Sequence, residues 1–259
     1  MFKLKRILFP VDFSERSEKA ASYVDALTTR FDADLMLLHV VQPPTYNTFL
    51  GDAPGSHWES FGHVFCDHHL RIQHLTEHGE VASKIVECAG SLNVDLIMMP
   101  THGLGVYRRL IIGSNTAKVL HDSTHPVWTS THIQDAPAHS KTTCDHVVCA
   151  VDLRPSSAGA LQWAARFAEA CHAKLTLLHV TTNSPAARRA LEALQKDAGS
   201  KAAVRIESGD PAEVVALVTQ ELNADLLVIG RASASEFLGR LEMTEYSIIR
   251  QSPCPVISV

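Results

Sequence analysis

An internal repeat constrains the fold of this chain more than any other feature of its sequence. The segment ADLMLLHV at residues 33–40 returns 140 positions later as AKLTLLHV at residues 173–180. A second pair of matches, with an offset of 130, relates NVDL at residues 93–96 to NADL at residues 223–226. Because the matches form an ordered series, they indicate a tandem duplication rather than chance similarity between alanine- and leucine-rich helices.

The length of the chain agrees with two copies of one domain. Its 259 residues divide into units of about 130 residues, which is near the commonest domain size. A polar stretch that contains Pro137 separates the copies. We therefore expect an N-terminal domain over residues 1–133, a linker over residues 134–144 and a C-terminal domain over residues 145–259.

Composition excludes several classes of protein. The formal net charge is −5 and Lys and Arg are scattered, so no basic stripe suggests nucleic-acid binding. No apolar run reaches transmembrane length, and Pro10 and Asp12 interrupt the N-terminal apolar run before a signal peptide could be complete. The six cysteines stand at positions 66, 88, 144, 149, 171 and 254. They form no CxxC pair, which favours a reduced, cytoplasmic protein without membrane association.

Apolar strands alternate with amphipathic helices in both copies. In the first copy we expect strands at 6–11, 34–41, 71–77, 94–100 and 126–131 and helices at 15–30, 56–69, 81–92 and 114–121. In the second copy we expect strands at 147–152, 175–181, 202–208, 225–230 and 255–259 and helices near 156–171, 185–198, 211–222 and 243–250. This α/β pattern predicts two tandem doubly wound αβα sandwich domains, each with a five-stranded, mostly parallel sheet.

Two glycine turns around a predicted helix start suggest an anion site in the first copy. An apolar strand runs into His102 and Gly103, and Gly113-Ser114 then opens a helix. The first N–H groups of a helix have no intrahelical partners and carry the positive end of its dipole, so an anion binds there readily. As N-cap, Ser114 would add a hydroxyl. The alternative is that both glycines are ordinary turn residues before a capped helix.

Asp12 follows the first predicted strand, and ligands of doubly wound sheets bind beyond the carboxyl ends of the strands. A carboxylate at that place can accept hydrogen bonds from a ribose hydroxyl or an adenine amine. Alternatively, Asp12 caps the helix that follows it through the local Asp-Phe-Ser sequence. The sequence leaves both interpretations open.

Three segments together resemble the universal stress protein family: PVDFSERS after the first strand, the strand LLHV, and G-x9-G-S before a short helix and HPV. The resemblance covers nearly the whole chain and indicates a tandem two-domain member. It implies the adenine nucleotide alpha hydrolase-like fold of that family. It also implies a cytoplasmic stress-response sensor or regulator that binds ATP, with Mg²⁺ as a companion ion left open.

The resemblance also implies a set of binding residues, because the ATP-binding members carry the motif G-2x-G-9x-G-S/T. Transferred to this chain, the site comprises Pro10, Asp12, Val40, Pro100, His102, Gly103, Gly113, Ser114, Asn115 and Thr116. Pro100 departs from the motif, since it stands where the first glycine is expected. Proline lacks the backbone donor and the conformational freedom of glycine, so any ligand contact that needs either is lost.

The second copy departs from the motif in the opposite way. It keeps Gly230 but has Ser233 and Met243 where the second and third glycines are expected, with Thr244 at the hydroxyl position. A methionine side chain at the phosphate turn would crowd an anion. We therefore expect a degenerate second site, although Asp152 keeps its position.

No enzymatic machinery is recognisable. The sequence has no GxxxxGK[ST] motif and no convincing catalytic triad, so we expect at most slow ATP hydrolysis. Arg108 and Arg109 either reach a phosphate or lie on the solvated surface. A third class of function is an interaction scaffold that binds no nucleotide. The two domains would then pack as a pseudo-dimer through the strands at 126–131 and 255–259, and a homodimer is also left open.

A histidine-rich segment in the first copy suggests one further hypothesis. Six of the fifteen histidines lie within residues 57–78. If residues 56–69 are helical, His63, Cys66 and Asp67 share one face at a spacing compatible with a zinc site. A half-exposed polar face needs no metal, so both interpretations stay open.

Overall fold

The computed structural model describes residues 2–42, 58, 61, 65, 71–101, 112–130, 144–231 and 242–259. The chain divides into two compact units, one built mainly of residues 3–127 and the other mainly of residues 143–259. We call them the first and the second domain. The expected linker at 134–144 lies outside the described residues except for Cys144, so its bounds remain a prediction.

Strands and helices alternate along the first domain. Its described elements are β1 (Arg6–Pro10), α1 (Glu15–Phe31), β2 (Asp34–Val41), β3 (Arg71–His78), α3 (Val81–Ser91), β4 (Leu96–Met99), α4 (Ser114–Asp122) and β5 (Val127–Thr129). Across the sheet the strands follow the order β3-β2-β1-β4-β5, and β1 pairs in parallel with both β2 and β4. Strand order reverses between β1 and β4, which makes their carboxyl ends the switch point of a doubly wound sheet.

The second domain repeats this arrangement. Its described elements are β6 (His146–Ala150), α5 (Ser156–Cys171), β7 (Lys174–Val180), α6 (Ser184–Ala198), β8 (Ala203–Glu207), α7 (Pro211–Glu221), β9 (Leu226–Ile229), α8 (Glu242–Gln251) and β10 (Val256–Ser258). The strand order is β8-β7-β6-β9-β10, with parallel pairing at each of these steps. The predicted fold class, two tandem α/β domains with parallel sheets, is confirmed.

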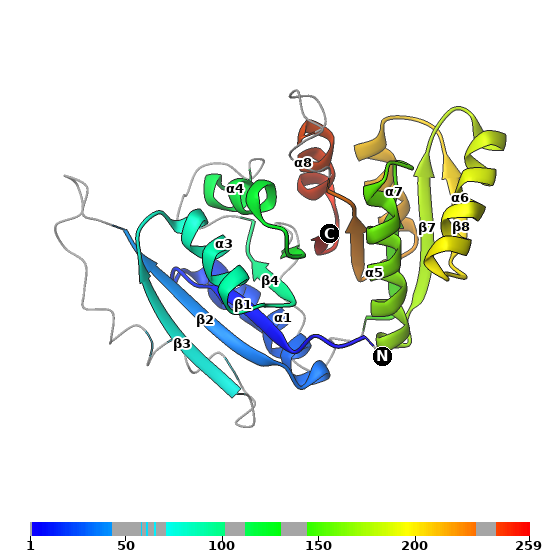
Figure 1. The fold of residues 1–259 in the computed structure, drawn as a ribbon. Coiled ribbons are helices and arrows are strands. Elements are labelled where there is room, and N and C mark those ends of the chain that lie inside the picture. The colour runs from blue at the N-terminus through cyan, green and yellow to red at the C-terminus, as the bar shows by residue number, and fades with distance from the viewer. Residues whose placement is uncertain are drawn as a thin grey trace. The chain divides into compact units, whose positions relative to one another are not determined.

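Helices lie on both faces of the first sheet. Helix α3 packs against α4 and contacts β2, whereas α1 contacts β1 and β4. Figure 1 shows α3 and α4 on one side of the sheet and α1 on the other. In the second domain α5 packs against α6, and α7 packs against α8. This layering requires strands that are apolar on both faces, as the near-continuous apolar runs of the sequence predict.

The central strands form the core of each domain. In the first domain the side chains of Ile7, Leu8, Phe9, Leu35, Leu37, Leu38, Leu96 and Ile97 are almost completely buried. In the second domain Val147, Val148, Cys149, Leu177, Leu178, Leu227 and Val228 are equally buried. Each large apolar side chain removed from water contributes about 1.5–3 kcal/mol to folding. The buried strands therefore fix the positions of the loops at their carboxyl ends.

The ends of the helices follow local chemistry. Ser14 caps α1 by accepting a hydrogen bond from Ser17 N, and Asp32 ends the helix in the left-handed conformation. Asn183 caps α6 through its side chain, and Gly199 ends that helix with a φ of 63°. These residues explain why the sequence pattern predicts these helices to within a few residues.

The other predictions for the whole chain have mixed outcomes. Of the helix expected at 56–69, only Trp58, Phe61 and Phe65 lie within the described residues, and Trp58 and Phe61 are helical. None of the helices in the described ranges is long and apolar enough to cross a membrane.

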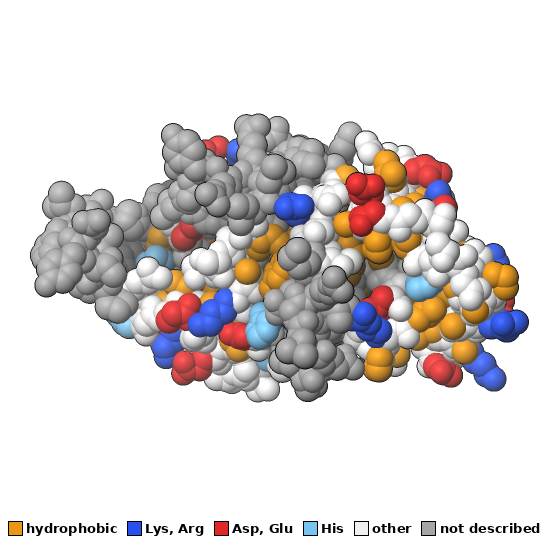
Figure 2. Space-filling view, turned by 90° about the horizontal axis from the view of Figure 1, so that it is seen from above, with side chains coloured by type: hydrophobic (Ala, Val, Ile, Leu, Met, Phe, Trp, Pro, Cys, Tyr) orange, Lys and Arg blue, Asp and Glu red, His pale blue; other side chains and the backbone are white. Residues whose placement is uncertain are grey.

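The five cysteines that the structure describes form no disulfide, and burial raises the pKa of Cys149 to about 12. On the face drawn in Figure 2, Lys and Arg side chains are interspersed with Asp and Glu.

Candidate functional site

Asp12 lies two residues beyond β1, where the chain turns into α1. The N–H of the preceding residue, Val11, donates to Leu38 O (2.8 Å) and so continues the pairing with β2. One carboxylate oxygen of Asp12, Oδ1, accepts hydrogen bonds from Ser14 N (3.1 Å), Ser14 Oγ (2.6 Å) and Ser17 Oγ (2.6 Å). Within the described residues the second oxygen, Oδ2, accepts none. Ser14 is the N-cap of α1, and Oδ1 of Asp12 holds this cap from outside the helix.

The turn between Asp12 and α1 requires a strained backbone. Phe13 has a φ of 56°, which lies in the left-handed region that bulky residues rarely adopt. Leu153 follows Asp152 at the equivalent position of the second domain and has a φ of 65°. Such a conformation costs on the order of 1–3 kcal/mol and is common at binding sites. Both domains therefore present their aspartate on the same type of turn.

The carboxyl end of β2 is tied to the end of β1. The ring nitrogen Nδ1 of His39 lies 3.0 Å from Val11 O, and Nδ1 of His179 lies 2.7 Å from Val151 O in the second domain. The histidine of each LLHV strand thus bonds across to the end of the neighbouring strand. Val40 follows His39 in β2 and is half-buried. Its predicted contact with a nucleoside stays a prediction.

The start of α4 differs from the expectation in one respect. We predicted Ser114 as the N-cap, but the N-cap is Gly113 and the helix begins at Ser114. The reason is a pair of backbone hydrogen bonds: Gly113 N donates to Thr101 O (2.8 Å), and Gly113 O accepts from Ala117 N (2.8 Å). No side chain caps this helix, and the side chain of Ser114 is exposed.

This helix start can bind an anion. The N–H groups of Ser114 and Asn115 belong to the first turn and have no acceptor within the helix. The first turn also contains no acidic residue, so the positive end of the helix dipole is not neutralised by an adjacent carboxylate. Two N–H groups and the exposed Ser114 hydroxyl therefore lie beyond the carboxyl end of β4, the strand that neighbours β1.

Pro100 and Thr116 connect β4 to this helix. The Thr116 hydroxyl, which is buried, donates to Pro100 O (3.1 Å). Proline at this position thus leaves the carbonyl available to fix the start of α4, although it supplies no N–H to a ligand. The other residues predicted for the anion site, His102 and Gly103, lie outside the described residues. Arg108 and Arg109 also lie outside them.

An ion pair that the sequence pattern did not reveal also holds α4. Glu80 is the N-cap of α3, and its carboxylate accepts from Ser83 N (2.8 Å), Ser83 Oγ (2.5 Å) and Lys118 Nζ (2.9 Å). The Ser83 hydroxyl first, and then Lys118, lower the pKa of Glu80 to about 2. Lys118 lies on α4, so this contact joins the N-terminus of α3 to the helix of the anion site.

Aromatic side chains pack around Phe13, the residue that follows Asp12. The ring of Phe13 lies 4.7 Å from that of His39 and 5.0 Å from that of Trp58, measured between centroids. Trp58 also stacks on His74 at 4.6 Å with nearly parallel planes. One histidine of the predicted metal-binding segment therefore packs against an aromatic ring. A spacing analysis along the chain could not find these contacts, because they join three distant segments.

The metal hypothesis has no structural test in the described part of the chain. Its candidate ligands, His63, Cys66 and Asp67, all lie outside the described residues. Within the described ranges, no group of three or more His, Cys, Asp or Glu side chains could hold a metal ion.

The aspartate of the second domain is engaged more completely than Asp12. Oδ1 of Asp152 accepts hydrogen bonds from Arg154 N (2.9 Å) and Ser157 Oγ (2.9 Å). The guanidinium of Arg154 lies 3.3 Å from the other oxygen, Oδ2. Because arginine replaces the serine of the first domain at this position, its own side chain occupies the oxygen that Asp12 leaves available.

Gly230 of the second domain lies at a close contact between two elements. A Cβ at Gly230 would lie 3.3 Å from the Ser156 carbonyl and hydroxyl oxygens, so the retained glycine is explained by a close approach of β9 to α5. Helix α8 begins at Glu242, two positions before the equivalent of Ser114, and so includes Met243. Glu245 stands in its first turn, where a carboxylate opposes a bound anion.

The architecture defines a class of protein, a tandem doubly wound α/β sandwich with parallel sheets. The model of the universal stress protein family matches residues 3–58, 66–130, 143–195 and 182–259. The chain therefore belongs to the universal stress protein family.

The chain is also similar to individual proteins. A universal stress protein of Synechocystis is 31% identical over 130 residues, which cover 48% of this chain and 83% of the relative. The crystal structure of a universal stress protein from Archaeoglobus fulgidus covers 99% of this chain and 96% of its own at 23% identity, with a TM-score of 0.74. A universal stress protein crystallised in complex with cAMP is 28% identical and covers 44% of this chain and 95% of its own, with a TM-score of 0.40.

Proposed function

We propose that the first domain binds an adenine nucleotide, ATP, and that the protein acts through this site as a sensor or regulator in a stress response. One observation carries the proposal. An aspartate with an available carboxylate oxygen and a helix start without a capping side chain follow β1 and β4, the two strands of the switch point. The switch point is where doubly wound sheets bind their ligands.

Each group has a distinct role in this proposal. Oδ2 of Asp12 accepts a hydrogen bond from a ribose hydroxyl, and the backbone of Val40 lies against the nucleoside. The N–H groups of Ser114 and Asn115 and the Ser114 hydroxyl donate to phosphate oxygens. Mg²⁺ accompanies the phosphates. No part of this scheme requires an N–H from residue 100, so a proline at that position is compatible with binding.

The second domain is proposed not to bind a nucleotide. Arg154 already interacts with the oxygen of Asp152 that a ribose would use. The first turn of α8 includes Glu245, and a carboxylate there repels a phosphate. We therefore expect one nucleotide per chain.

Calorimetry on nucleotide-stripped protein tests the proposal, with Ser114→Glu as the decisive variant. Ser114 is exposed, and a carboxylate in the first turn of a helix stabilises the helix by about 0.3–1 kcal/mol, so the variant should fold at least as well as the wild type. The same carboxylate would lie beside the phosphates. A repulsion of about 2 kcal/mol lowers affinity about 30-fold.

Thr244→Glu is the matched control, because Thr244 stands at the position of the second domain equivalent to Ser114. This variant should bind ATP as the wild type does. Absence of ATP binding by the stripped wild type would refute the proposal and favour a nucleotide-independent scaffold. Equal affinities of Ser114→Glu and the wild type would show that the phosphates lie elsewhere.

A further inference from the structure

Strand β3 forms a long and exposed edge of the first sheet. It is the last strand in the order β3-β2-β1-β4-β5, and Figure 1 shows it at the margin of the domain. All eight residues pair with β2. Six of the eight side chains are exposed, and the other two are only half-buried. Ile72 is 37% exposed and is one of two large apolar side chains that the described residues expose to this degree.

The outer backbone edge of β3 follows from its pairing with β2. Gly79 N donates to Val41 O, so the backbone groups of this odd-numbered residue face β2. Because these groups alternate in direction along a strand, those of Arg71, Gln73, Leu75 and Glu77 also face β2. The N–H and C=O groups of Ile72, His74, Thr76 and His78 point outward. No strand of the described residues pairs with them.

Such an edge is a template for another strand. Proteins usually protect long edges with proline, lysine, a bulge or a covering element. The sequence of β3, RIQHLTEH, contains neither proline nor lysine. Its middle residues, from Ile72 to Thr76, carry no full charge, and two of them are β-branched.

The equivalent edge of the second domain is different. β8 is five residues long, and α6 packs against it. Its central Arg205 forms ion pairs with Glu207 and with Glu221 of α7 (both 2.7 Å). Four of its five side chains are half-buried. The two edges descend from one duplicated strand, so β8 serves as an internal control for β3.

The sequence of β3 is complementary to itself in one antiparallel register. If a two-fold axis passes through His74, Arg71 lies opposite the partner's Glu77, and Ile72 lies opposite the partner's Thr76. Arg71 and Glu77 would form a pair without backbone hydrogen bonds between them, in which side chains approach most closely. A register centred on Leu75 would instead put Arg71 opposite the partner's Gly79 and lose this ion pair.

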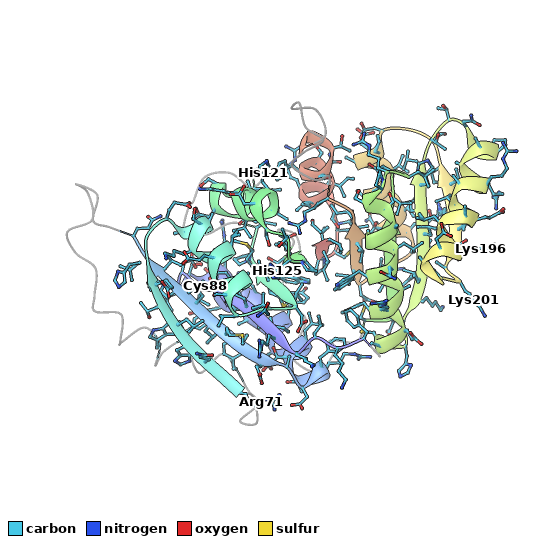
Figure 3. All side chains as sticks on the ribbon, viewed as in Figure 1. Arg71, Cys88, His121, His125, Lys196 and Lys201 are labelled. Atoms are coloured by element: carbon cyan, nitrogen blue, oxygen red, sulfur yellow. The ribbon has the colours of Figure 1, made fainter. Side chains whose placement is uncertain are left out.

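Arg71 is already positioned for such a contact. Its guanidinium donates to Asp32 Oδ1 (3.0 Å), to Asp32 O (2.7 Å) and to the carboxylate of Asp34. These contacts use three of its five N–H donors and leave two for another carboxylate. Figure 3 shows Arg71 at the amino end of β3. Glu77 lies near the other end of the strand and is 3.8 Å from Lys84.

We propose that β3 pairs with β3 of a second copy of this chain, antiparallel about a two-fold axis at His74, and joins the two first-domain sheets edge to edge. The outward groups of Ile72, His74 and Thr76 then exchange backbone hydrogen bonds with those of the partner's Thr76, His74 and Ile72. The interface is isologous, so it closes at a dimer and does not extend into a fibre.

One strand pair buries a small area, so the dimer is expected to be weak and to depend on concentration. This proposal does not rest on nucleotide binding.

Sedimentation velocity from micromolar to millimolar concentration measures the association, with Thr76→Pro as the disrupting variant. The N–H of Thr76 points away from β2, so proline removes a donor of the interface and none of the donors to β2. We expect Thr76→Pro to weaken dimerisation by about tenfold or more. Ile206→Pro makes the equivalent change on β8, where Thr181 N donates to Glu207 O and residue 206 likewise points outward.

The proposal requires Ile206→Pro to associate as the wild type does. A wild type that stays monomeric throughout, or equal effects of the two proline variants, would overturn it.

Cross-linking tests the register directly and does not depend on the fold of a proline variant. In the proposed dimer the two copies of residue 74 face each other across the axis, with Cα atoms about 5.5 Å apart, a separation that a disulfide spans. His74→Cys should form a covalent dimer under mild oxidation. Thr76→Cys should not, because its two copies lie several residues apart along the paired strands. Cross-linking of both variants to the same extent, or of neither, would contradict the proposed register.

Discussion

Replacement of Asp12 by alanine should destabilise the first domain although it removes no core side chain. Oδ1 of Asp12 accepts from the backbone N–H of Ser14 and from the hydroxyls of Ser14 and Ser17. Both serines are buried. Without the carboxylate, these donors lose their acceptor and the first turn of α1 loses its connection to β1.

The magnitude follows from the contacts. A hydrogen bond to a charged group contributes about 1.5–3 kcal/mol, but Asp12 is partly exposed, so water replaces part of what is lost. We expect Asp12→Ala to lower the free energy of unfolding of the first domain by about 2–3 kcal/mol. The matched variant, Asp152→Ala, removes two hydrogen bonds and an ion pair from an exposed carboxylate, where water replaces more of the loss, and should cost the second domain about 1 kcal/mol.

Hydrogen exchange measured by mass spectrometry in increasing urea can test this, because it follows peptides of each domain separately. Domain resolution matters because a two-domain chain need not unfold in one step. The second domain should keep its wild-type stability in Asp12→Ala. A change below about 0.5 kcal/mol in the first domain, within the range of ordinary surface substitutions, would refute the reasoning.

Two further variants test local energetics. Lys118→Met removes the half-exposed ion pair with Glu80 (2.9 Å) and should cost about 0.5 kcal/mol at neutral pH. The Ser83 hydroxyl and then Lys118 lower the pKa of Glu80 to about 2, so the stability gained from its ionised form is present above an ordinary carboxyl pKa of about 4.3 and is lost as the pH falls toward 2. The difference between Lys118→Met and the wild type in urea unfolding should therefore disappear over that range, and a constant difference would argue against it. Gly209→Ala places a Cβ 2.9 Å from Val214 Cγ2 at a φ of 140° and should cost the second domain more than about 1 kcal/mol in the same assay.

The sequence predicts the elements of this fold well, because hydrophobic pattern and helix caps agree along most of the chain. The run DLMLLHVV predicts β2 at its observed bounds, and helix α5 also begins and ends where expected. The hydrophobic pattern and the helix caps each depend on residues that are close in sequence, and the duplication repeats them in the second domain. The His-rich segment gave no such agreement between signals, and most of it lies outside the described residues.

The details of the site depend on contacts that a local pattern does not contain. Ser114 was expected to cap α4, but the backbone of Gly113 takes that position through its bond to Thr101 in a distant strand end. For Asp12 the sequence left two roles open. The structure makes Ser14 the N-cap and Oδ1 of Asp12 the acceptor that holds it, whereas Oδ2 accepts no hydrogen bond within the described residues. The difference from Asp152 rests on a single substitution, Arg154 in place of Ser14.

The stoichiometry of ATP binding, measured by titration calorimetry on nucleotide-stripped protein, tests the central claim most directly. The account predicts one ATP per chain, with binding weakened about 30-fold in Ser114→Glu and unchanged in Thr244→Glu. Two ATP per chain would contradict the claim that the second domain binds no nucleotide. A stripped wild-type protein that releases no heat with ATP would contradict the nucleotide site itself.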